Sequence, residues 1–516
     1  MSRKPTNRGR KNTNNASTSE DAKTKFRNGK FDKPKKPTND PKWYGQSPEL
    51  IRDAASIPFS WPSGSNLGSD TFIGRNTNPG AIALDLTPTV GYSGSEYSPI
   101  NVAASAIYTF VRHANSGHSN YDAPDLMIYL LAMSNIYSFL TWCQRILGIV
   151  SLYDQRNRYT PRTLFKLNTV DPDSISNNIA KFRYWLNTYI TKVASLVVPS
   201  VMPVFQRMAF IYSNVYIDGP TIKDQFYMYT PHNLAWYKFS LDTDDRGQLT
   251  LEAMPKAGTY ATVEEIMAYG EDLFNAIWQQ EDFGIMSGDI LKAYGANIIK
   301  LSPIAPDFQL MPIYDTMVLH QMKNAKFMTY IIPSGITQTA QGVIMHHLLI
   351  DTTAANINQV AQGKILLMDS ILTSDFPEPT PDVVIESTRL MPGFRTPGSD
   401  PVGGTEIMTN IKVAQFGNDY TADDPFTISL GNFVFDTNGS VAIVDVMDAF
   451  ARSGIFKAFK YAPEIVALQI TGTNVVKGQR LWDIDNYAIL SNQDLIHMHE
   501  AALLSLFAVP SIAKIS

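Results

Sequence analysis

The sequence predicts an α+β fold with a basic N-terminal arm. Three observations support this prediction: helical spacing of apolar residues in the first half of the 516 residues, short β-type runs in the second half, and a cationic leader. The length and a 44% hydrophobic content allow two or three packed regions. We divide the chain into a disordered basic arm (1–46), a helix-rich domain with a small β hairpin (47–325), a β-rich domain (326–490) and a C-terminal helix that returns to the first domain (491–516).

The arm carries most of the positive charge. Residues 1–42 contain 13 Lys and Arg against 4 Asp and Glu, a net charge of +9, and the 30 basic and 44 acidic residues that remain give −14. Only Phe26 and Phe31 are large and apolar there, so burial does not offset the ordering entropy. We expect a disordered arm that contacts a polyanion or, alternatively, a solubilising or nuclear-localisation tail. The candidate binding residues are Arg3, Lys4, Arg8, Arg10, Lys11, Lys23, Lys25, Arg27, Lys30, Lys33, Lys35, Lys36 and Lys42.

The residues after the arm are rich in turn formers. Gly, Pro, Ser and Asn punctuate residues 47–88, which we interpret as an extended surface chain. No apolar run near Met1 suits a secretory signal, so we expect a cytosolic protein. Cys143 is the single cysteine of the chain, which excludes an intrachain disulfide.

Helical spacing predicts a long helix over Leu126–Val150 that starts near Asp122 and Pro124. Its first 19 residues, Leu126–Gln144, carry no charge and are long enough to cross a membrane. Five polar residues interrupt this run, so a buried core helix is the favoured interpretation. They are Ser134, Asn135, Ser138, Thr141 and Gln144.

Two further helices and a hairpin are predicted before residue 325. Ser176 is expected to cap a helix that runs to Pro199, and the capping box Thr262–Glu265 starts a helix that reaches Trp278. The predicted strands are Phe226–Tyr229 and the hairpin of Trp236–Leu241 with Gln248–Glu252.

The second half has a β-type pattern. The expected strands are Phe327–Ile332, Val343–Ile350, and a hairpin of Asn432–Phe435 with Val441–Val446 around Asn438-Gly439. Six prolines and four glycines in Phe376–Gly404 predict an exposed loop. Ser491–Phe507 is expected to form the last helix, and no repeat of fixed period is present.

Motifs for catalysis or nucleotide binding are incomplete in this chain. Gly363-Lys364 lacks the first glycine and the hydroxyl residue of a phosphate-binding loop. Gly91–Ser95 has the second glycine of a serine-hydrolase elbow one place early, so a turn is expected. Asp242–Gly247 resembles the start of a calcium loop, but Arg246 occupies a ligand position, so a hairpin turn is expected.

The histidines and carboxylates also lack a catalytic pattern. His346-His347 and His497–Glu500 do not have the i, i+4 spacing of a zinc hydrolase. The acidic residues of 264–282 follow the polar side of a helix. We therefore predict no catalytic residue, metal or cofactor. Two alternatives remain: an enzyme with a basic tail whose site assembles from residues such as His320, His346, His347 and the helix carboxylates, and a monomeric RNA-binding host protein.

One segment carries a family resemblance. Glu281–Gly295, with the sequence EDFGIMSGDILKAYG, is similar to a stretch of picobirnavirus capsid proteins, and the general layout is shared with partitivirus coat proteins. In physical terms, we expect Ser287 to cap a short helix ending at Gly295, with Ile290, Leu291 and Tyr294 packed inward.

The resemblance implies a structural role and no enzyme activity. It implies a mainly helical shell domain, a β-rich projecting domain, and dimers that close into a small icosahedral shell around double-stranded RNA. It also implies a viral polymerase inside the virion, assembly in the host cytoplasm, and contact with a host surface or membrane during infection. The Pro- and Gly-rich loop Phe376–Gly404 is expected at the tip of the projection. The resemblance further implies self-cleavage of the arm, as in some members of the family, and Asn39-Asp40-Pro41 is our candidate position. Unlike the arm of several relatives, this arm has no regularly repeated motif. The acidic body leads to the hypothesis that the inner wall repels RNA.

Overall fold

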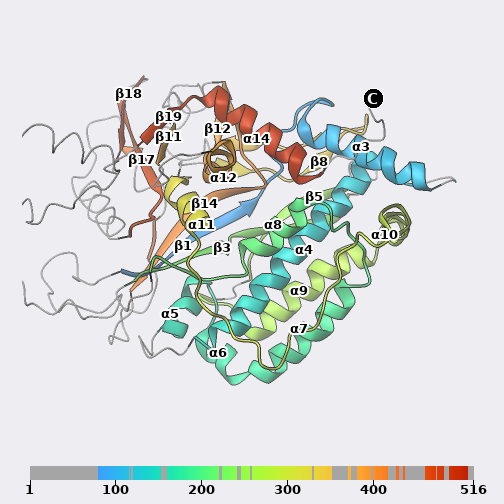
Figure 1. Ribbon diagram of the computed structural model, residues 1–516, viewed down its shortest axis with the longest axis horizontal. Helices are drawn as coiled ribbons and strands as arrows, with labels where there is room; N and C mark the ends of the chain where they lie inside the picture. The colour runs from blue at the N-terminus through green and yellow to red at the C-terminus, as the bar shows by residue number, and fades with distance from the viewer. Residues whose placement is uncertain are drawn as a thin grey trace, which may run out of the picture. The chain divides into compact units, whose positions relative to one another are not determined.

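The computed structural model describes most of the chain between Pro79 and Ala508. The chain divides into two compact units, Met1–Ser60 and Trp61–Ser516, and every described residue belongs to the second unit. The described residues are 79–115, 117, 120–152, 160–219, 224–240, 246–255, 258–327, 331–350, 370–373, 380–396, 399–415, 426–428, 434–435, 459–471, 474–480 and 487–508. Figure 1 shows helices packed beside a mixed β-sheet, which confirms the α+β class.

A five-stranded sheet forms the centre of the described unit. β1 (Pro79–Pro88) pairs antiparallel with β14 (Glu406–Gln415) and parallel with β3 (Phe226–Pro231). β15 (Phe426–Ile428) and β2 (Tyr216–Ile217) complete the edges in the order β15-β14-β1-β3-β2. The sheet therefore joins segments more than 300 residues apart in sequence.

β1 corrects the last part of the predicted extended surface chain, residues 79–88, while residues 47–78 lie outside the described residues. Ala81, Ile82, Ala83, Leu84 and Leu86 are each fully buried. A central strand whose side chains are buried on both faces has a continuous apolar run. The turn-forming residues beside this run led to the incorrect prediction. Proline at both ends is compatible with the strand because it lies outside the core of the ladder.

α4 (Ala123–Ile149) is the core helix and confirms the predicted Leu126–Val150 helix. It contacts α3 (Pro99–Ala114), α7 (Ile179–Val193), α8 (Pro203–Ile211) and α9 (Val263–Trp278). In Figure 1, α4, α9 and α7 run alongside one another, and each of the three contacts the other two. α4 alone among the described helices is long and apolar enough to cross a membrane, but 94% of its most apolar window is buried inside the protein. The core-helix interpretation is thus confirmed.

The predicted capping box of α9 is present, whereas the predicted cap at Ser176 is wrong. The Thr262 amide donates to Glu265 Oε2 at 2.8 Å, and the Glu265 amide donates to Thr262 Oγ1 at 3.3 Å. Ser176 lies inside the short helix α6 (Pro172–Asn177), where its hydroxyl donates to the Pro172 carbonyl at 2.7 Å. Asp171 caps α6 with proline following at the first helical position, a stronger start signal than a lone serine.

α7 therefore begins after Asn178 and ends at Val193, earlier than the predicted limit at Pro199. Its predicted apolar side is otherwise present: Phe182, Trp185, Leu186 and Tyr189 are buried. Stacked Phe182, Trp185 and Tyr189 rings extend along this face.

α10 (Glu281–Tyr294) contains the segment that resembles picobirnavirus capsid proteins, and it corrects two details. Ser287 is not a cap but a mid-helix residue whose hydroxyl accepts from the Val197 amide at 2.8 Å. Gly295 ends the helix with φ 57°, as predicted. Ile290 and Tyr294 are buried, but Leu291 is 46% exposed and does not pack inward.

The predicted hairpin in the first half is confirmed. β4 (Asn233–Ser240) pairs antiparallel with β5 (Arg246–Ala253) over its whole length. The predicted turn at Asp242–Gly247 lies mostly outside the described residues, and the strands that flank it are paired up to Ser240 and Arg246. Gly91–Ser95 is neither helix nor a regular strand, and Ser93 makes an isolated bridge to His346.

The second half contains short strands as predicted, with different pairings. Val434–Phe435 (β16) pairs parallel with Glu464–Thr471 (β17), whereas the predicted partner Val441–Val446 lies outside the described residues. The remaining described strands are β6 (Lys326–Phe327), β7 (Ile331–Pro333), β8 (Thr337–Gln338), β9 (Ile344–Met345), β10 (Leu348–Ile350), β11 (Ser370–Thr373), β18 (Asn474–Arg480) and β19 (Tyr487–Leu490).

The described part of Phe376–Gly404 is not an exposed loop. It forms α12 (Pro381–Ser387) and the hairpin of β12 (Gly393–Thr396) with β13 (Ser399–Val402). Leu390 and Met391 between them are buried. Prolines that indicated a loop occupy regular positions, because Pro381 follows the helix cap Thr380.

The remaining helices connect these parts. α5 (Thr160–Leu167) contacts β1 and β14, and α11 (Thr316–Asn324) contacts α12 and β11. The predicted C-terminal helix is confirmed as α14 (Asn492–Leu506), capped by Ser491, and it contacts α3 and β12. The division at residue 326 into shell and projecting domains stays a prediction.

Candidate functional site

The predicted binding residues of the arm, from Arg3 to Lys42, lie outside the described residues. Their contact with a polyanion therefore stays a prediction. The candidate sites among the described residues are two buried polar networks, two cavities and a set of exposed apolar side chains.

A buried ionic network connects α8, α11 and α12 to β14. Arg207 Nε donates to Glu406 Oε1 at 2.9 Å, and Arg207 Nη1 donates to Gln321 Oε1 at 3.2 Å. The Nε of Arg389 lies 3.6 Å from the same Glu406 oxygen. Gln321 and Arg389 both donate to Glu386, each at 3.2 Å. Four elements distant in sequence are thus held by one set of hydrogen-bonded charges.

The charges in this network stabilise each other. Burial alone would raise the pKa of Glu406, but Arg207 and Arg389 outweigh it and lower the pKa to about 2. Burial would likewise lower the pKa of Arg207, and the Glu406 carboxylate reverses this and raises it. Both groups are therefore ionised at neutral pH, which suits a structural pair rather than an acid–base catalyst.

Sequence reasoning missed this network. Arg207 is a single cation within the apolar helix α8, which is a signal for a buried charge that needs a partner. Its partner Glu406 is 199 residues away, and no local pattern identifies it.

A second polar network surrounds His346. Its Nε2 lies 2.9 Å from Thr89 Oγ1, and its backbone pairs with Ser93 in both directions at 2.9 Å. The Ser93 hydroxyl donates to the Ile344 carbonyl at 2.6 Å, and Asn101 donates to the same carbonyl at 3.0 Å. Burial lowers the pKa of His346 to about 4, so the ring is neutral at pH 7. The network fastens the residues after β1 to β9.

The histidines of the predicted enzyme alternative have separate structural partners. His320 Nδ1 lies 2.7 Å from the Thr316 carbonyl within α11, and its ring meets Tyr461. His347 contacts the Tyr92 ring edge-on. His499 Nε2 lies 2.6 Å from the Met391 carbonyl, and burial lowers its pKa. Among the described residues, no group of three or more His, Cys, Asp or Glu is placed to hold a metal.

Two of the helix carboxylates, Glu264 and Glu271, also have structural partners. Glu264 pairs with Lys181 at 2.6 Å, and a hydrogen bond from that lysine lowers the Glu264 pKa. Glu271 accepts from Trp185 Nε1 at 2.9 Å and from Lys192 at 2.7 Å. These pairs tie α7 to α9.

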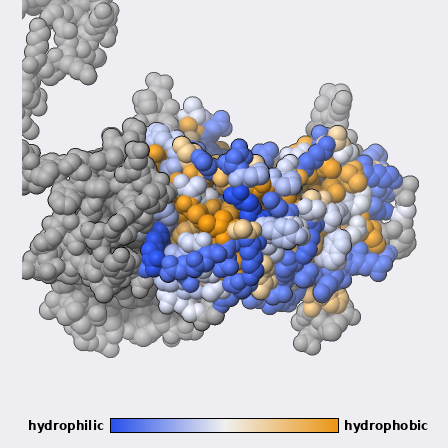
Figure 2. All heavy atoms as spheres, turned by 90° about the horizontal axis from the view of Figure 1, so that it is seen from below, coloured by the Kyte–Doolittle hydropathy of each residue, from blue (hydrophilic) through white to orange (hydrophobic). Residues whose placement is uncertain are grey.

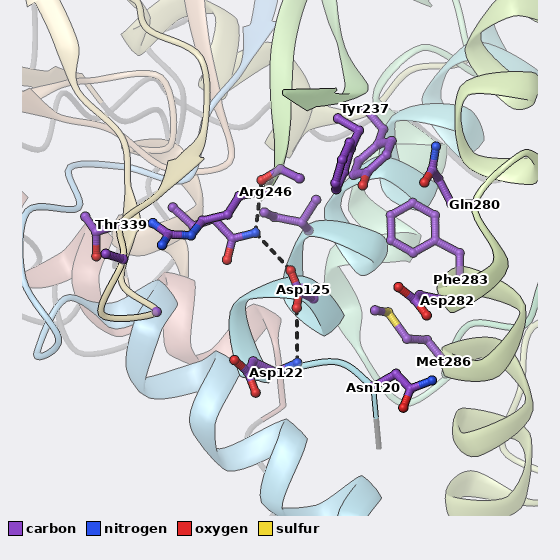
Figure 3. A pocket seen from close by; sticks show the side chains of 16 residues that line it. Asn120, Asp122, Asp125, Tyr237, Arg246, Gln280, Asp282, Phe283, Met286 and Thr339 are labelled. Atoms are coloured by element: carbon purple, nitrogen blue, oxygen red, sulfur yellow. Dashed lines mark hydrogen bonds between the residues drawn. The ribbon is translucent and has the colours of Figure 1, made fainter. Parts of the chain in front are cut away.

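A cavity of about 310 Å³ lies where α4, the β4–β5 hairpin, β8 and α10 meet (Figure 3). Asp125 accepts from Gln338 Nε2 at 2.8 Å and from the Asp122 amide at 3.1 Å, as the dashed lines of Figure 3 show. Asp282 and the Tyr237 ring also line it. Burial, followed by the charges of Asp125 and Asp282, raises the pKa of Tyr237 to about 12. The cavity is lined by three carboxylates, Asp122, Asp125 and Asp282, and by one cation, Arg246.

A larger apolar cavity of about 600 Å³ is lined by α4, α7, α8 and the segment 298–308. Apolar side chains are also exposed elsewhere, and Figure 2 shows them as small groups separated by hydrophilic residues on the face seen from below. The large exposed ones are Tyr97, Val102, Tyr184, Val201, Phe239, Trp278, Ile285, Leu291, Met311 and Tyr314.

The buried charges and histidines described above join distant parts of the fold, and the class of protein follows from its relatives. Comparison with known proteins identifies which one. The family described as Picobirnavirus, Capsid protein matches residues 43–348, more than half of the chain. The chain belongs to this family, and it is a capsid protein of the virion.

Two individual relatives agree with the family. The capsid protein precursor of Human picobirnavirus (strain Human/Thailand/Hy005102/-) is 28% identical over 515 residues, covering 92% of this chain and 91% of the relative. A solved structure, the X-ray crystallographic structure of the picobirnavirus capsid, matches with a TM-score of 0.68 at 21% identity, covering 92% of this chain and all of that one. The resemblance carried by Glu281–Gly295 is thus confirmed, and the family indicates a structural role rather than the enzyme alternative.

Proposed function

We propose that this chain assembles as dimers into a closed icosahedral shell that encloses double-stranded RNA. Membership in the capsid family carries the proposal. A chain whose single cysteine, Cys143, is buried and free must be held in a shell by non-covalent contacts. Two-fold dimers are the commonest symmetric oligomers, which favours them as the building unit of the shell.

The arm is the proposed RNA contact. Its 13 basic residues neutralise phosphates and release counterions, a form of binding that does not depend on sequence. Double-stranded RNA hides its base edges in a deep, narrow groove, so the arm would read only charge and shape. The body, with a net charge of −14, would repel the duplex and keep it mobile inside the shell.

Other partners and places follow from the same proposal. The shell would also hold the viral polymerase and would meet a host surface or membrane when the particle enters a cell. Assembly would take place in the host cytoplasm.

Particle size tests self-assembly directly. Sedimentation and light scattering of the full chain should show a megadalton species, well above the 57.4 kDa of one subunit. Negative-stain images should show closed particles of uniform size. A species that stays monomeric at every salt concentration would refute the proposal.

Salt dependence tests the arm. The affinity for RNA falls as salt rises, so a plot of log affinity against log salt has a negative slope. Replacing seven cations, from Lys23 to Lys36, with glutamine should make this slope less steep by up to about 6, at roughly 0.9 per phosphate contact. A matched variant with all seven residues as arginine should keep the slope, because the charge is kept. Equal slopes for the native protein and both variants would show that the arm does not contribute to RNA binding. The seven residues are Lys23, Lys25, Arg27, Lys30, Lys33, Lys35 and Lys36.

The relative from Human picobirnavirus is described as a capsid protein precursor, which supports removal of the arm. We place the cleavage at Asn39-Asp40-Pro41. Mass spectrometry of purified particles should then find a new N-terminus there, and Pro41→Ala should change the rate at which it appears. Particles that contain only full-length chains would refute the cleavage without affecting the shell.

A further inference from the structure

The outer face of α10 carries two large exposed apolar side chains. Its inner face is buried through Phe283, Met286 and Ile290, whereas Ile285 is 39% exposed and Leu291 is 46% exposed on the outside. In Figure 1, α10 lies at the outer edge of the helices, and it contacts α3, α4 and α9. Ile285 and Leu291 lie three residues before and three residues after Gly288, so they flank its position on the helix surface, as expected for a contact with another molecule.

Two glycines on the same face strengthen this indication. Gly284 and Gly288 are exposed, and a Cβ atom added at either position would have no neighbour within 4 Å. Glycine inside a helix is less stable than alanine, so it needs a compensating reason. Within the described part of the chain nothing lies close enough to exclude a methyl group. Close approach of a helix from another molecule provides that reason.

The charges of α10 identify the partner as a second copy. The exposed Glu281 and Asp282 lie in the first turn, and the exposed Lys292 lies in the last turn. A second α10 that runs antiparallel places its Lys292 beside these carboxylates, and the two-fold axis repeats the contact. The cavity beside Asp282 is lined by two more carboxylates, Asp122 and Asp125, and by one cation, Arg246 (Figure 3).

We propose that α10 packs antiparallel against α10 of a second copy across a two-fold axis. Gly284 and Gly288 lie at the crossing, Ile285 and Leu291 form the apolar contact, and Lys292 pairs with the acidic first turn of the other copy. This inference rests on the proposed self-assembly and names the face that provides one of its contacts. The surface is isologous, as a two-fold contact requires.

Charge reversal tests the antiparallel arrangement. Lys292→Glu alone and the pair Glu281→Lys with Asp282→Lys should each weaken dimerisation at least tenfold in sedimentation velocity, because like charges then meet twice. All three substitutions together should restore it, since the charges are exchanged. Lys300→Glu, an equal charge change at an exposed residue outside α10, is the matched control and should leave the dimer unchanged.

Cross-linking tests proximity without relying on affinity. The native Cys143 is buried, so Gly288→Cys supplies an accessible thiol on the proposed axis. A short bismaleimide should convert this variant into a covalent dimer of twice 57.4 kDa. Tyr184→Cys on α7, where the native side chain is 78% exposed, is the control and should remain largely monomeric.

The outcomes separate this inference from the proposed shell. If particles form normally from every α10 variant and Gly288→Cys cross-links no better than Tyr184→Cys, the α10 contact is wrong and the shell stands. If the unmodified chain forms neither dimers nor particles, both proposals are wrong. Restored dimerisation in the triple variant together with selective cross-linking at Gly288 would support the inference.

Discussion

Removing the charge of Glu406 should cost a large part of the stability of the subunit. Glu406→Gln keeps the shape but leaves the Arg207 guanidinium buried, with its side chain 7% exposed, and without its carboxylate. Breaking a buried ion pair from one side costs about 3–5 kcal/mol. The pKa gives a similar figure, because lowering it from 4.5 to about 2 corresponds to about 3 kcal/mol.

Urea denaturation of unassembled subunits, followed by fluorescence of the seven tryptophans, would measure the loss. The double variant Arg207→Met with Glu406→Met should recover most of it, since neither charge then remains unpaired. A loss below about 1 kcal/mol for Glu406→Gln would refute the reasoning.

The same pair predicts a pH dependence. The folded pKa of Glu406 is lowered, so the unfolded chain binds its proton first as the pH falls. The stabilisation is complete above the unfolded value near 4.5 and is lost as the pH falls through about 2. Glu406→Gln should therefore flatten the stability curve between these values, and an unchanged curve would contradict the assignment.

Three further substitutions test other features. Gly270→Ala should destabilise the subunit by about 1–3 kcal/mol in thermal unfolding, because its Cβ would lie 2.6 Å from Phe139 Cε1. Gly284→Ala, where the added Cβ has open space, should stabilise it by about 0.5–1 kcal/mol. A neutral Gly270→Ala would contradict the packing. The lowered pKa of His346 means that the free energy of unfolding falls by up to about 3 kcal/mol as the pH drops from 6.5 through 4. His346→Gln, which does not titrate in this range, should remove this dependence in denaturation curves, and an unchanged dependence would contradict the assignment.

Elements with local signals were predictable from sequence. The capping box at Thr262 located α9, apolar spacing located α4, and Ser491 located the start of α14. The hairpin of β4 and β5 was also predictable, because its strands are separated by one polar turn. In each case the residues that decide the structure lie within one element or its neighbour.

Elements decided by distant partners were not predictable. β1 has an apolar run, but its antiparallel partner β14 lies more than 300 residues later, so turn formers nearby dominated the interpretation. Ser287 resembles a cap, yet its hydroxyl accepts from Val197 instead. The Arg207–Glu406 pair has the same origin, because only the folded sheet brings α8 to β14.

The pairing of β1 with β14 has a consequence for synthesis of the protein. β1 leaves the ribosome early but its antiparallel partner is made roughly 320 residues later, a delay of about 16–64 s at about 5–20 residues per second. The central sheet stays incomplete during that interval. The subunit therefore cannot complete its fold until late in translation, so synthesis of the chain precedes its assembly into a shell.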